Sequence, residues 1–519
     1  MKAVTRLPAL LLLMGSTVYG HPQGRDYSPQ HAHEARGSLA VAATNGSSNP
    51  LIFYGRFIST PDPSTLSIQP NMAILVTTND GRGVIAATAQ NVSRPEDAAA
   101  ALGVSTSTQI ITPTTDNSFF FPGFIDTHIH APQYPNLGLF AGTLLDWLQK
   151  YTFPMESSLS TLKSPQYANW TGSSPPNPYE RARRVYNRVI DSTLSFGTTT
   201  CAYYATIDVP ATNLLADLAY QKGQRALIGR TCMDNQQYNP DYYRDESTEA
   251  AINATWAVIN HVQALDPSGD LVAPIITPRF APACTNESMS ALGKIAAEKN
   301  LPTQMHIDEN VREVALVAQM YPEQDSYAAT YDAHGLLTNR TILAHAVHVT
   351  DAEIALIAAR GSGVSHCPDS NSALGSGIAP VRKMRDAGIA VGLGTDAAGG
   401  FSPSLLDNVR QAFLVSQLLS FQEGQNSSLI IPVAEALYLG TMGGAKVVGM
   451  EGRLGGFQKG MLFDAQEITL GSDADEVGDV DIFGWENWSD RVMKWVWGGN
   501  ADNVSRVWVG GRLVSSKVV

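Results

Sequence analysis

Short apolar segments alternate with helical stretches from Phe119 to about Met450, which is most of the 519-residue chain. The helical stretches include Ala291–Lys299 and Asp351–Ala359. Such alternation is typical of strand–helix units in a parallel sheet, because two parallel strands need a long crossover connection. The candidate strands number eight: Phe124–His130, Gly197–Ala202, Ala226–Met233, Leu271–Thr277, Thr303–Ile307, Thr341–Ala346, Gly363–Ser365 and Val391–Gly394. Because eight such units close a (β/α)₈ barrel, we predict an α/β fold with a TIM-type barrel over residues 119–455.

The segments on either side of the predicted barrel are also strand-like. They are Leu51–Tyr54, Met72–Val76, Phe463–Ile468, Lys494–Gly498 and Arg506–Val514. The sequence Val509-Gly510-Gly511-Arg512 is typical of a tight hairpin turn. We expect residues 51–118 and 456–519 to pair with each other and to form a small β-sandwich satellite domain from both ends of the chain.

The N-terminus has the pattern of a secretory signal peptide. Lys2 and Arg6 precede an apolar run, Leu7–Met14, and Val18-Tyr19-Gly20 fits a cleavage site. The apolar run is too short to span a bilayer. We therefore predict a signal peptide over residues 1–20, a flexible leader over residues 21–50, and a secreted protein without membrane attachment once the signal is removed.

Composition and charge narrow the class of protein. With 44% hydrophobic and 16% charged residues, the chain is typical of folded globular proteins. A net charge of −13 without a basic cluster disfavours nucleic acids and anionic membrane surfaces as partners.

The glycosylation sequons and the cysteines indicate the cellular compartment in which the protein is expected. The N-x-Ser/Thr sequons favour a secreted glycoprotein, and their asparagines are Asn45, Asn91, Asn169, Asn253, Asn286, Asn339, Asn426, Asn487 and Asn503. The four cysteines have no CxxC spacing, so we predict free core thiols rather than a disulfide framework; they are Cys201, Cys232, Cys284 and Cys367.

Histidines and a carboxylate recur at the carboxyl ends of the predicted strands, where barrel enzymes place their chemistry. His128 and His130 end the first strand, and they point to the same side because successive strand residues alternate faces. The others are His306 at the end of the fifth strand, His345 at the end of the sixth and Asp396 at the end of the eighth. Imidazoles and a carboxylate suit a divalent ion such as Zn²⁺.

Each of these residues alone would carry little weight. A single histidine at a strand end is usually a hydrogen-bonded core residue, and Asp396 alone would fit a helix cap. Their recurrence at successive strand ends favours a metal site. A divalent ion lowers the pKa of bound water towards ~7. Asp396 and His345 would then orient and deprotonate that water, and Glu309 would protonate a substrate nitrogen and the leaving group. Such a set suits hydrolysis at a carbon–nitrogen centre.

Longer stretches carry a more specific signal. They are Pro122–Tyr134, Leu145–Pro154, Gly197–Thr206, Cys232–Asp234, Thr277–Phe280, His306–Asn310, Leu343–His345, His366–Pro368 and Gly392–Gly400. Together they resemble the amidohydrolase superfamily and, within it, the guanine deaminases. The resemblance extends from about Leu51 to Val514, and Pro122–Pro154 is specific to that family.

The resemblance implies a zinc-dependent hydrolase that converts guanine to xanthine and ammonia, with one Zn²⁺ per chain in a homodimer. It implies that the metal ligands are His128, His130, His306 and Asp396. Glu309 would be the proton shuttle, with His345 beside the attacking water. The residues that hold the purine would be Gln133, Arg279 and Phe280, because an amide and a guanidinium suit its polar edge and a ring suits its face.

The sequence departs from this family in two respects. Met305 and Asp308 flank His306 where small residues are usual, and the extra carboxylate of Asp308 would shift the proton affinity of Glu309. The secretory signal is the second departure, because the familiar members are cytosolic.

Two alternatives remain open. One is a related secreted aminohydrolase that acts on a pterin or a modified purine, although Gln133 and Arg279 match the guanine enzymes. The other is a catalytically inactive purine-binding or metal-binding protein, which the presence of Glu309 and Asp396 disfavours. A cytidine-deaminase type of zinc fold is disfavoured because its P-C-x-x-C pattern is absent.

Overall fold

The computed structural model describes residues 49–79, 82–172, 174, 176–471 and 480–517. The predicted signal peptide and residues 21–48 of the predicted leader lie outside the described residues, as does Asn45.

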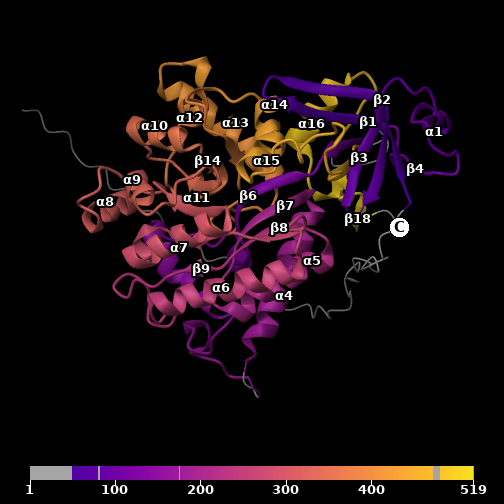
Figure 1. Cartoon of the computed structure of the whole chain (residues 1–519). Coiled ribbons are helices and arrows are strands. Elements are labelled where there is room, and N and C mark those ends of the chain that lie inside the picture. Colours follow the sequence, from indigo (N-terminus) through magenta and orange to yellow (C-terminus); the bar gives the residue numbers. More distant parts are fainter. Residues whose placement is uncertain (1–48, 80–81, 173, 175, 472–479, 518–519) are drawn as a thin grey trace, which may run out of the picture. The chain divides into compact units, whose positions relative to one another are not determined.

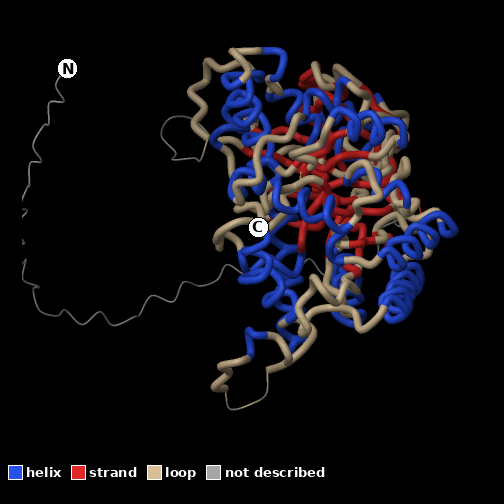
Figure 2. The backbone as a smooth tube through the Cα atoms, turned by 90° about the vertical axis from the view of Figure 1, so that its left-hand side faces the viewer, coloured by secondary structure: helices blue, strands red, loops and turns tan. Residues whose placement is uncertain are grey.

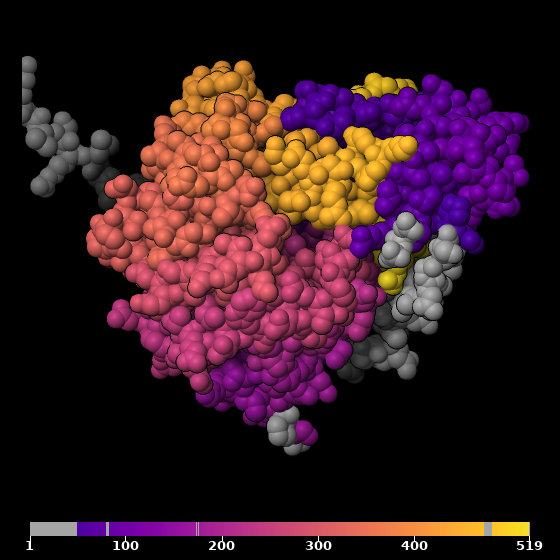
Figure 3. Space-filling view, in the orientation of Figure 1, coloured from indigo at the N-terminus to yellow at the C-terminus, as the bar shows by residue number. Residues whose placement is uncertain are grey.

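Strands from both ends of the chain form one mixed sheet of eight strands. They are β1 (Leu51–Asp62), β2 (Thr65–Asn79), β3 (Arg82–Ala89), β4 (Gln109–Ile111), β5 (Ser118–Pro122), β16 (Ala465–Thr469), β17 (Val504–Val509) and β18 (Arg512–Ser516). The order is β18-β17-β16-β5-β1-β2-β3, with β4 beside β1. β16 pairs antiparallel with both β5 and β17 and so joins the two ends of the chain. Figures 1 and 3 show the N-terminal and C-terminal segments side by side.

The predicted pairing of the two ends is therefore found, while the division into two facing sheets of a sandwich stays a prediction. Because β5 belongs to this sheet, the sheet includes residues that we assigned to the barrel from 119 onward. The predicted hairpin is confirmed: Val509 pairs with Arg512, and Gly510 and Gly511 have φ values of 54° and 72°. These positive angles suit the two-residue turn that follows the strand twist.

One predicted strand is wrong. Lys494–Gly498 lies in the helix α16 (Trp488–Gly498). Its buried residues are Val492, Trp495 and Val496, which is the spacing of one helical face. The prediction failed because a short apolar run reads equally well as a strand or as part of a helix.

All eight predicted barrel strands are present, in two parallel sheets of four. The first sheet has the order β10-β8-β7-β6, with β6 (Phe124–His130), β7 (Thr198–Tyr204), β8 (Arg225–Gly229) and β10 (Val272–Pro274). The second has the order β12-β13-β14-β15, with β12 (Thr303–Ile307), β13 (Thr341–His345), β14 (Gly363–His366) and β15 (Val391–Leu393). Two predicted strands are interrupted, so that β9 (Thr231–Cys232) and β11 (Thr277–Pro278) form a separate short pair.

Backbone contacts connect the edges of the two parallel sheets. Ile276, just after β10, forms a parallel bridge with Thr303 of β12. On the other side, the Asp396 N–H donates to the His128 carbonyl at 2.8 Å, and the His130 N–H donates to the Ala397 carbonyl at 3.1 Å. The carboxyl ends of β6 and β15 therefore lie together, although the ladder hydrogen bonds form two sheets and no single closed one among the described residues.

Helices lie outside the strands, as Figure 2 shows. The longer ones are α4 (Pro178–Ser195), α5 (Val209–Lys222), α6 (Thr248–Leu265), α7 (Asn286–Lys299), α8 (Val311–Met320), α10 (Asp351–Arg360) and α13 (Leu405–Gln422). The shorter ones are α1 (Ala98–Ala101), α2 (Leu144–Trp147), α3 (Phe153–Ser157), α9 (Tyr327–Ala333), α11 (Pro368–Ala373), α12 (Val381–Asp386), α14 (Val433–Tyr438) and α15 (Gly444–Val447). Side-chain N-caps mark several starts: Thr285 accepts from the Ser288 N–H, so α7 begins before the predicted residue 291.

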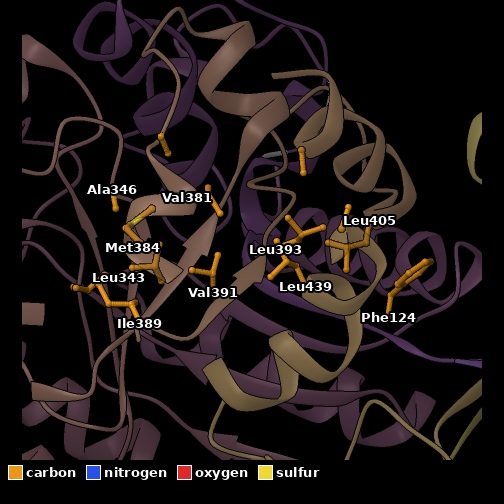
Figure 4. Packing of buried hydrophobic residues seen from close by; sticks show 14 of the residues in the cluster. Phe124, Leu343, Ala346, Val381, Met384, Ile389, Val391, Leu393, Leu405 and Leu439 are labelled. Carbon is orange, nitrogen blue, oxygen red and sulfur yellow. The ribbon is translucent and has the colours of Figure 1, made fainter. Parts of the chain in front are cut away.

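One cluster of buried hydrophobic residues includes the second parallel sheet and its helices. Figure 4 shows Leu343 and Val391 of this sheet packed near Met384 and Ile389, and Leu393 near Leu439. All four cysteines are buried and free, which confirms that prediction.

One segment of the described chain, Ser427–Val447, has the length and hydropathy of a membrane span. It is 61% buried inside the protein, and core helices of soluble proteins meet the same criterion. Leu437 and Leu439 within it are fully buried, so we assign the segment to the core.

Candidate active site

Three histidines and one aspartate converge at the carboxyl ends of the parallel strands. His128 and His130 come from β6, His306 from β12, and Asp396 from the loop after β15. All four are buried, and their ligand atoms lie within 4.8 Å of one another. The structure thus brings together the four residues that the sequence predicted as metal ligands.

The spacing of these donor atoms fits a single zinc ion. Asp396 Oδ1 lies 3.0 Å from His128 Nε2 and 3.3 Å from His130 Nε2. His130 Nε2 lies 3.1 Å from His306 Nε2. Donors that share one Zn²⁺ at bond lengths near 2.0–2.1 Å lie about 3 Å apart. Three imidazoles and a carboxylate are also donors that Zn²⁺ accepts readily. The residues present therefore fit the metal that the sequence predicted.

The environment keeps these donors in the forms that bind a metal. Burial lowers the pKa of His128 and His130 and lowers that of His306 further, which favours neutral imidazoles. Burial alone would raise the pKa of Asp396, but the adjacent His128 and His130 hold it well below its usual range, which favours the carboxylate.

Neighbouring groups orient the donors. His306 Nδ1 lies 2.7 Å from the backbone oxygen of Arg279, so that Nε2 is left to face the cluster. Ser370 donates from Oγ to Asp396 Oδ2 at 2.6 Å, which leaves Oδ1 towards the histidines. Asp126 accepts from the Thr395 N–H at 3.0 Å and thereby fixes the loop that carries Asp396.

The backbone around the cluster is strained. Asp308, His345, Ala346 and Asp396 are non-glycine residues in the left-handed region, with φ values of 49°, 75°, 49° and 46°. Each lies at or just after the end of β12, β13 or β15. Such conformations persist only where the surrounding structure enforces them, and they are enriched at functional sites.

Glu309 and His345 lie beside the metal-fitting cluster. Glu309 Oε2 is 3.5 Å from His345 Nε2, which is 3.9 Å from Asp396 Oδ2. Burial raises the pKa of Glu309 well above its usual range, and the charges of Asp396 and Glu313 raise it further. This shift favours the protonated form of the carboxyl, which can donate a proton.

His345 has the opposite protonation state to Glu309, because it lacks the proton that would charge its ring. Burial lowers its pKa to about 4, so the ring is neutral. Its Nδ1 lies 2.9 Å from Asn371 Oδ1, and an amide oxygen only accepts, so Nδ1 carries the proton. Nε2 is then a proton acceptor that faces Glu309 and Asp396. A proton donor and a proton acceptor thus stand on the same side of the cluster.

The expected effect of Asp308 on Glu309 is not found. The carboxyl of Asp308 interacts with Glu353 and Glu313, and burial raises its pKa well above the usual range. The pKa of Glu309 responds instead to Asp396 and Glu313. Met305, the other departure, is a fully buried core residue.

A cavity opens over the cluster. It encloses about 350 Å³ of space, including its opening to solvent. Its lining consists of His130, Gln133, Leu144, Trp147, Leu148, Arg279, Phe280, His306, Glu309, Leu374 and Asp396. The three residues predicted to hold a purine therefore share a cavity with the metal-fitting residues. Apolar walls with a few polar groups suit a planar heterocycle.

Glu156, on α3, was missed by the sequence analysis. It is fully buried, and its carboxylate binds Gln133, Arg279 and Tyr243. Burial would raise its pKa, but the charge and hydrogen bonds of Arg279 outweigh that effect and lower it. A search of strand ends does not reach α3, although Glu156 lies only two residues after the family-specific stretch that ends at Pro154.

Tyr204, at the end of β7, was also missed. Its ring centroid lies 4.7 Å from that of His128, 4.6 Å from His130 and 5.0 Å from His306. The tyrosine ring therefore packs against three of the metal-fitting imidazoles and restricts their orientation. Its position at the end of the second barrel strand is the signal that would have found it.

Known proteins resemble this chain over most of its length. The model of the amidohydrolase family matches residues 119–514. The chain is 47% identical over 398 residues to a probable guanine deaminase of Schizosaccharomyces pombe, which covers 76% of this chain and 71% of that protein. It is 42% identical over 401 residues to guanine deaminase of Dictyostelium discoideum, which covers 77% and 83%.

Solved structures resemble it as well. Guanine deaminase from C. acetobutylicum with bound guanine superposes with a TM-score of 0.76 at 32% sequence identity, covering 90% of this chain and 100% of that one.

Proposed function

Because this chain belongs to the amidohydrolase family, we propose that it catalyses the zinc-dependent hydrolysis of guanine to xanthine and ammonia. The observation that carries the proposal is the shared cavity: four metal-fitting residues, a proton carrier and the residues predicted to hold a purine all line or adjoin it. The similar curated proteins support the substrate.

The side chains have distinct roles in this proposal. One zinc ion per chain would be held by His128, His130, His306 and Asp396. When bound, it would act as a Lewis acid and lower the pKa of water to about 7. Oxygen from water adds to the amino-bearing ring carbon, the carbon–nitrogen bond breaks, and the amino group leaves as ammonia.

Proton transfer falls to Glu309 and His345. Glu309 protonates a ring nitrogen of the substrate, because its raised pKa favours the protonated carboxyl. His345, with Asp396, orients the attacking water and accepts its first proton, because Nε2 of the neutral ring is an acceptor. Glu309 then takes the remaining proton of the added hydroxyl and passes it to the departing amino group. The proton held by His345 returns to Glu309, which lies 3.5 Å away, and restores the starting state.

Substrate binding would use the opposite wall. Arg279 and Gln133 provide hydrogen bonds for the polar edge of guanine, and Phe280 provides an apolar face. The ring of Phe280 lies 6.3 Å from that of His306, which places an aromatic surface close to the metal-fitting cluster.

We also propose that the two parallel sheets form the TIM-type (β/α)₈ barrel of the family, which begins with β6 at Phe124. The backbone bonds between the sheet edges support this. The eight-stranded mixed sheet, which includes β5, would be its satellite domain.

Secretion, glycosylation and assembly are further parts of the proposal. Of the sequon asparagines in the described chain, Asn503 is buried, and the exposed ones are Asn91, Asn169, Asn253, Asn286, Asn339, Asn426 and Asn487. Their exposure supports glycan attachment after a signal peptide over residues 1–20 is removed. Peptide mapping of protein from the culture medium would test both features, and sedimentation would test the homodimer.

The decisive experiment is turnover of guanine by the purified protein. We expect xanthine and ammonia in equal amounts, loss of turnover after a chelator removes zinc, and recovery when Zn²⁺ is restored. Zinc content, measured by mass spectrometry, should approach one ion per chain. If zinc is bound but guanine is untouched, the substrate assignment is wrong, and pterins and modified purines are the next substrates to test. A protein that binds neither zinc nor purine would overturn the proposal.

A further inference from the structure

The side-chain amide of Gln133 is held in one orientation by a buried carboxylate. Its Nε2 donates to Glu156 Oε1 at 2.8 Å. Its Oε1 is buried and has no hydrogen-bond partner among the described residues. Gln133 lines the cavity above the metal-fitting cluster. The amide therefore has a satisfied donor on one side and an unsatisfied acceptor on the other.

The same carboxylate holds Arg279. Glu156 Oε2 accepts from Arg279 Nη1 at 2.7 Å and from the Tyr243 hydroxyl at 2.7 Å. Glu156 Oε1 accepts from Arg279 Nη2 at 3.0 Å as well as from Gln133. Each oxygen thus accepts two hydrogen bonds. Because Glu156 is fully buried, water does not reach its oxygens to replace any of these four hydrogen bonds.

A carboxylate fixes the direction of these bonds. An ionised carboxylate only accepts hydrogen bonds, whereas an amide can be rotated so that its oxygen and nitrogen exchange places. Rotation of Gln133 would bring its oxygen against Glu156 Oε1, and two buried acceptors repel. The charge of Arg279, held by the same group, keeps Glu156 ionised. Glu156 therefore decides which atom of Gln133 is left for a ligand.

We propose that Glu156 is a positioning residue that sets the hydrogen-bond polarity of the purine cavity. It presents Gln133 as an acceptor for a ring N–H of the substrate and Arg279 as a donor for a ring carbonyl. This inference rests on the proposed function, since it names the part of the purine that the cavity recognises. An oxopurine with a protonated ring nitrogen satisfies both groups, whereas an aminopurine presents the reverse pattern at the same edge.

Binding of two purines that lack the reactive amino group tests this polarity without turnover. Hypoxanthine has a 6-oxo group and an N1–H, whereas adenine has a 6-amino group and an unprotonated N1. A site that leaves a buried polar group unpaired rejects the wrong ligand strongly. With zinc-loaded protein in calorimetric titrations, we expect hypoxanthine to bind at least ~100-fold more tightly than adenine.

The substitution Glu156→Gln should remove the preference of the cavity for hypoxanthine over adenine. A glutamine at this position accepts or donates, so Gln133 can rotate, and we expect the ratio of the two dissociation constants to fall below ~10 through weaker hypoxanthine binding. Tyr243→Phe is the matched control, because Tyr243 binds the oxygen of Glu156 that does not contact Gln133. It should keep the ratio within about threefold of wild type, and both variants should keep their zinc.

Gln133→Met provides a second test that leaves Glu156 in place. It removes the acceptor with little change in volume, so the preference should fall in the same way. The inference is overturned if wild type binds the two purines equally or binds neither. It is also overturned if Glu156→Gln weakens both equally or Gln133→Met retains the preference. Guanine turnover by the wild type reports separately on the proposed function.

Discussion

Replacing Glu309 by glutamine removes the proposed proton carrier while keeping the shape of the side chain. Glu309 is 3% exposed, and its Oε1 has no hydrogen-bond partner in the described part of the chain. The backbone N–H of Glu309 donates to Glu313 Oε2 at 3.0 Å, a contact that the substitution leaves intact. Glu309 is also absent from the four-residue cluster that fits zinc. The expected effect is therefore confined to proton transfer.

The size of the effect follows from the burial of the site. A positioned general acid or base contributes about 10²- to 10⁴-fold to the rate. Because Glu309 is only 3% exposed, bulk water is a poor substitute for it, and we expect the upper half of that range. A loss of 10³- to 10⁴-fold in kcat is about 4–5.5 kcal/mol in the activation barrier. KM for guanine should change by less than about threefold, since the purine-binding residues are untouched.

The assay is steady-state xanthine formation at saturating guanine, with zinc content measured on the same samples. Glu323→Gln is the control, because Glu323 is an exposed carboxylate outside the cavity. A fall in kcat of less than tenfold with full zinc content would refute the proton-carrier role. Loss of zinc in Glu309→Gln would show instead that this residue is a ligand.

Three further predictions concern the metal and the fold. Burial lowers the pKa of the metal-facing histidines, so protons compete with zinc only below the usual histidine pKa of about 6.5. The zinc content should therefore be the same at pH 7 and at pH 6.5. Loss of zinc between these two pH values would contradict the prediction. Asp464→Ala leaves the buried Arg225 unpaired, and urea denaturation should show a free energy of unfolding lower by about 3–5 kcal/mol. Gly197→Ala places a Cβ against the side chain of Gln466 at a φ of 81°, and should cost more than ~1 kcal/mol. Gly103→Ala, at a φ of 69° with open space around it, should be less destabilising in the same assay.

Much of the site was predictable because its residues lie where a simple local pattern places them. Two-residue alternation puts His128 and His130 on one face of a strand, and parallel strands bring their carboxyl ends to the same edge. His306, His345 and Asp396 follow from the same rule. The strand predictions succeeded for the same reason: their apolar segments are short and are bounded by helical stretches. The error at Lys494–Gly498 arose because a short apolar run fits both the two-residue period of a strand and the 3.6-residue period of a helix.

The sequence by itself determined that histidines and carboxylates stand at the ends of the parallel strands. The tertiary structure decided which groups surround them and in what orientation. Glu156 lies 23 residues from Gln133 and 123 from Arg279, on a short helix, and no periodicity connects the three. Their contact exists only because the α3 segment packs beside the Ala131–Asn136 segment that follows β6 and beside the loop after β11. The direction of an amide, the charge of a buried carboxylate and the ring of Tyr204 against three imidazoles depend on such packing, because burial and neighbouring charges act through space and not along the chain.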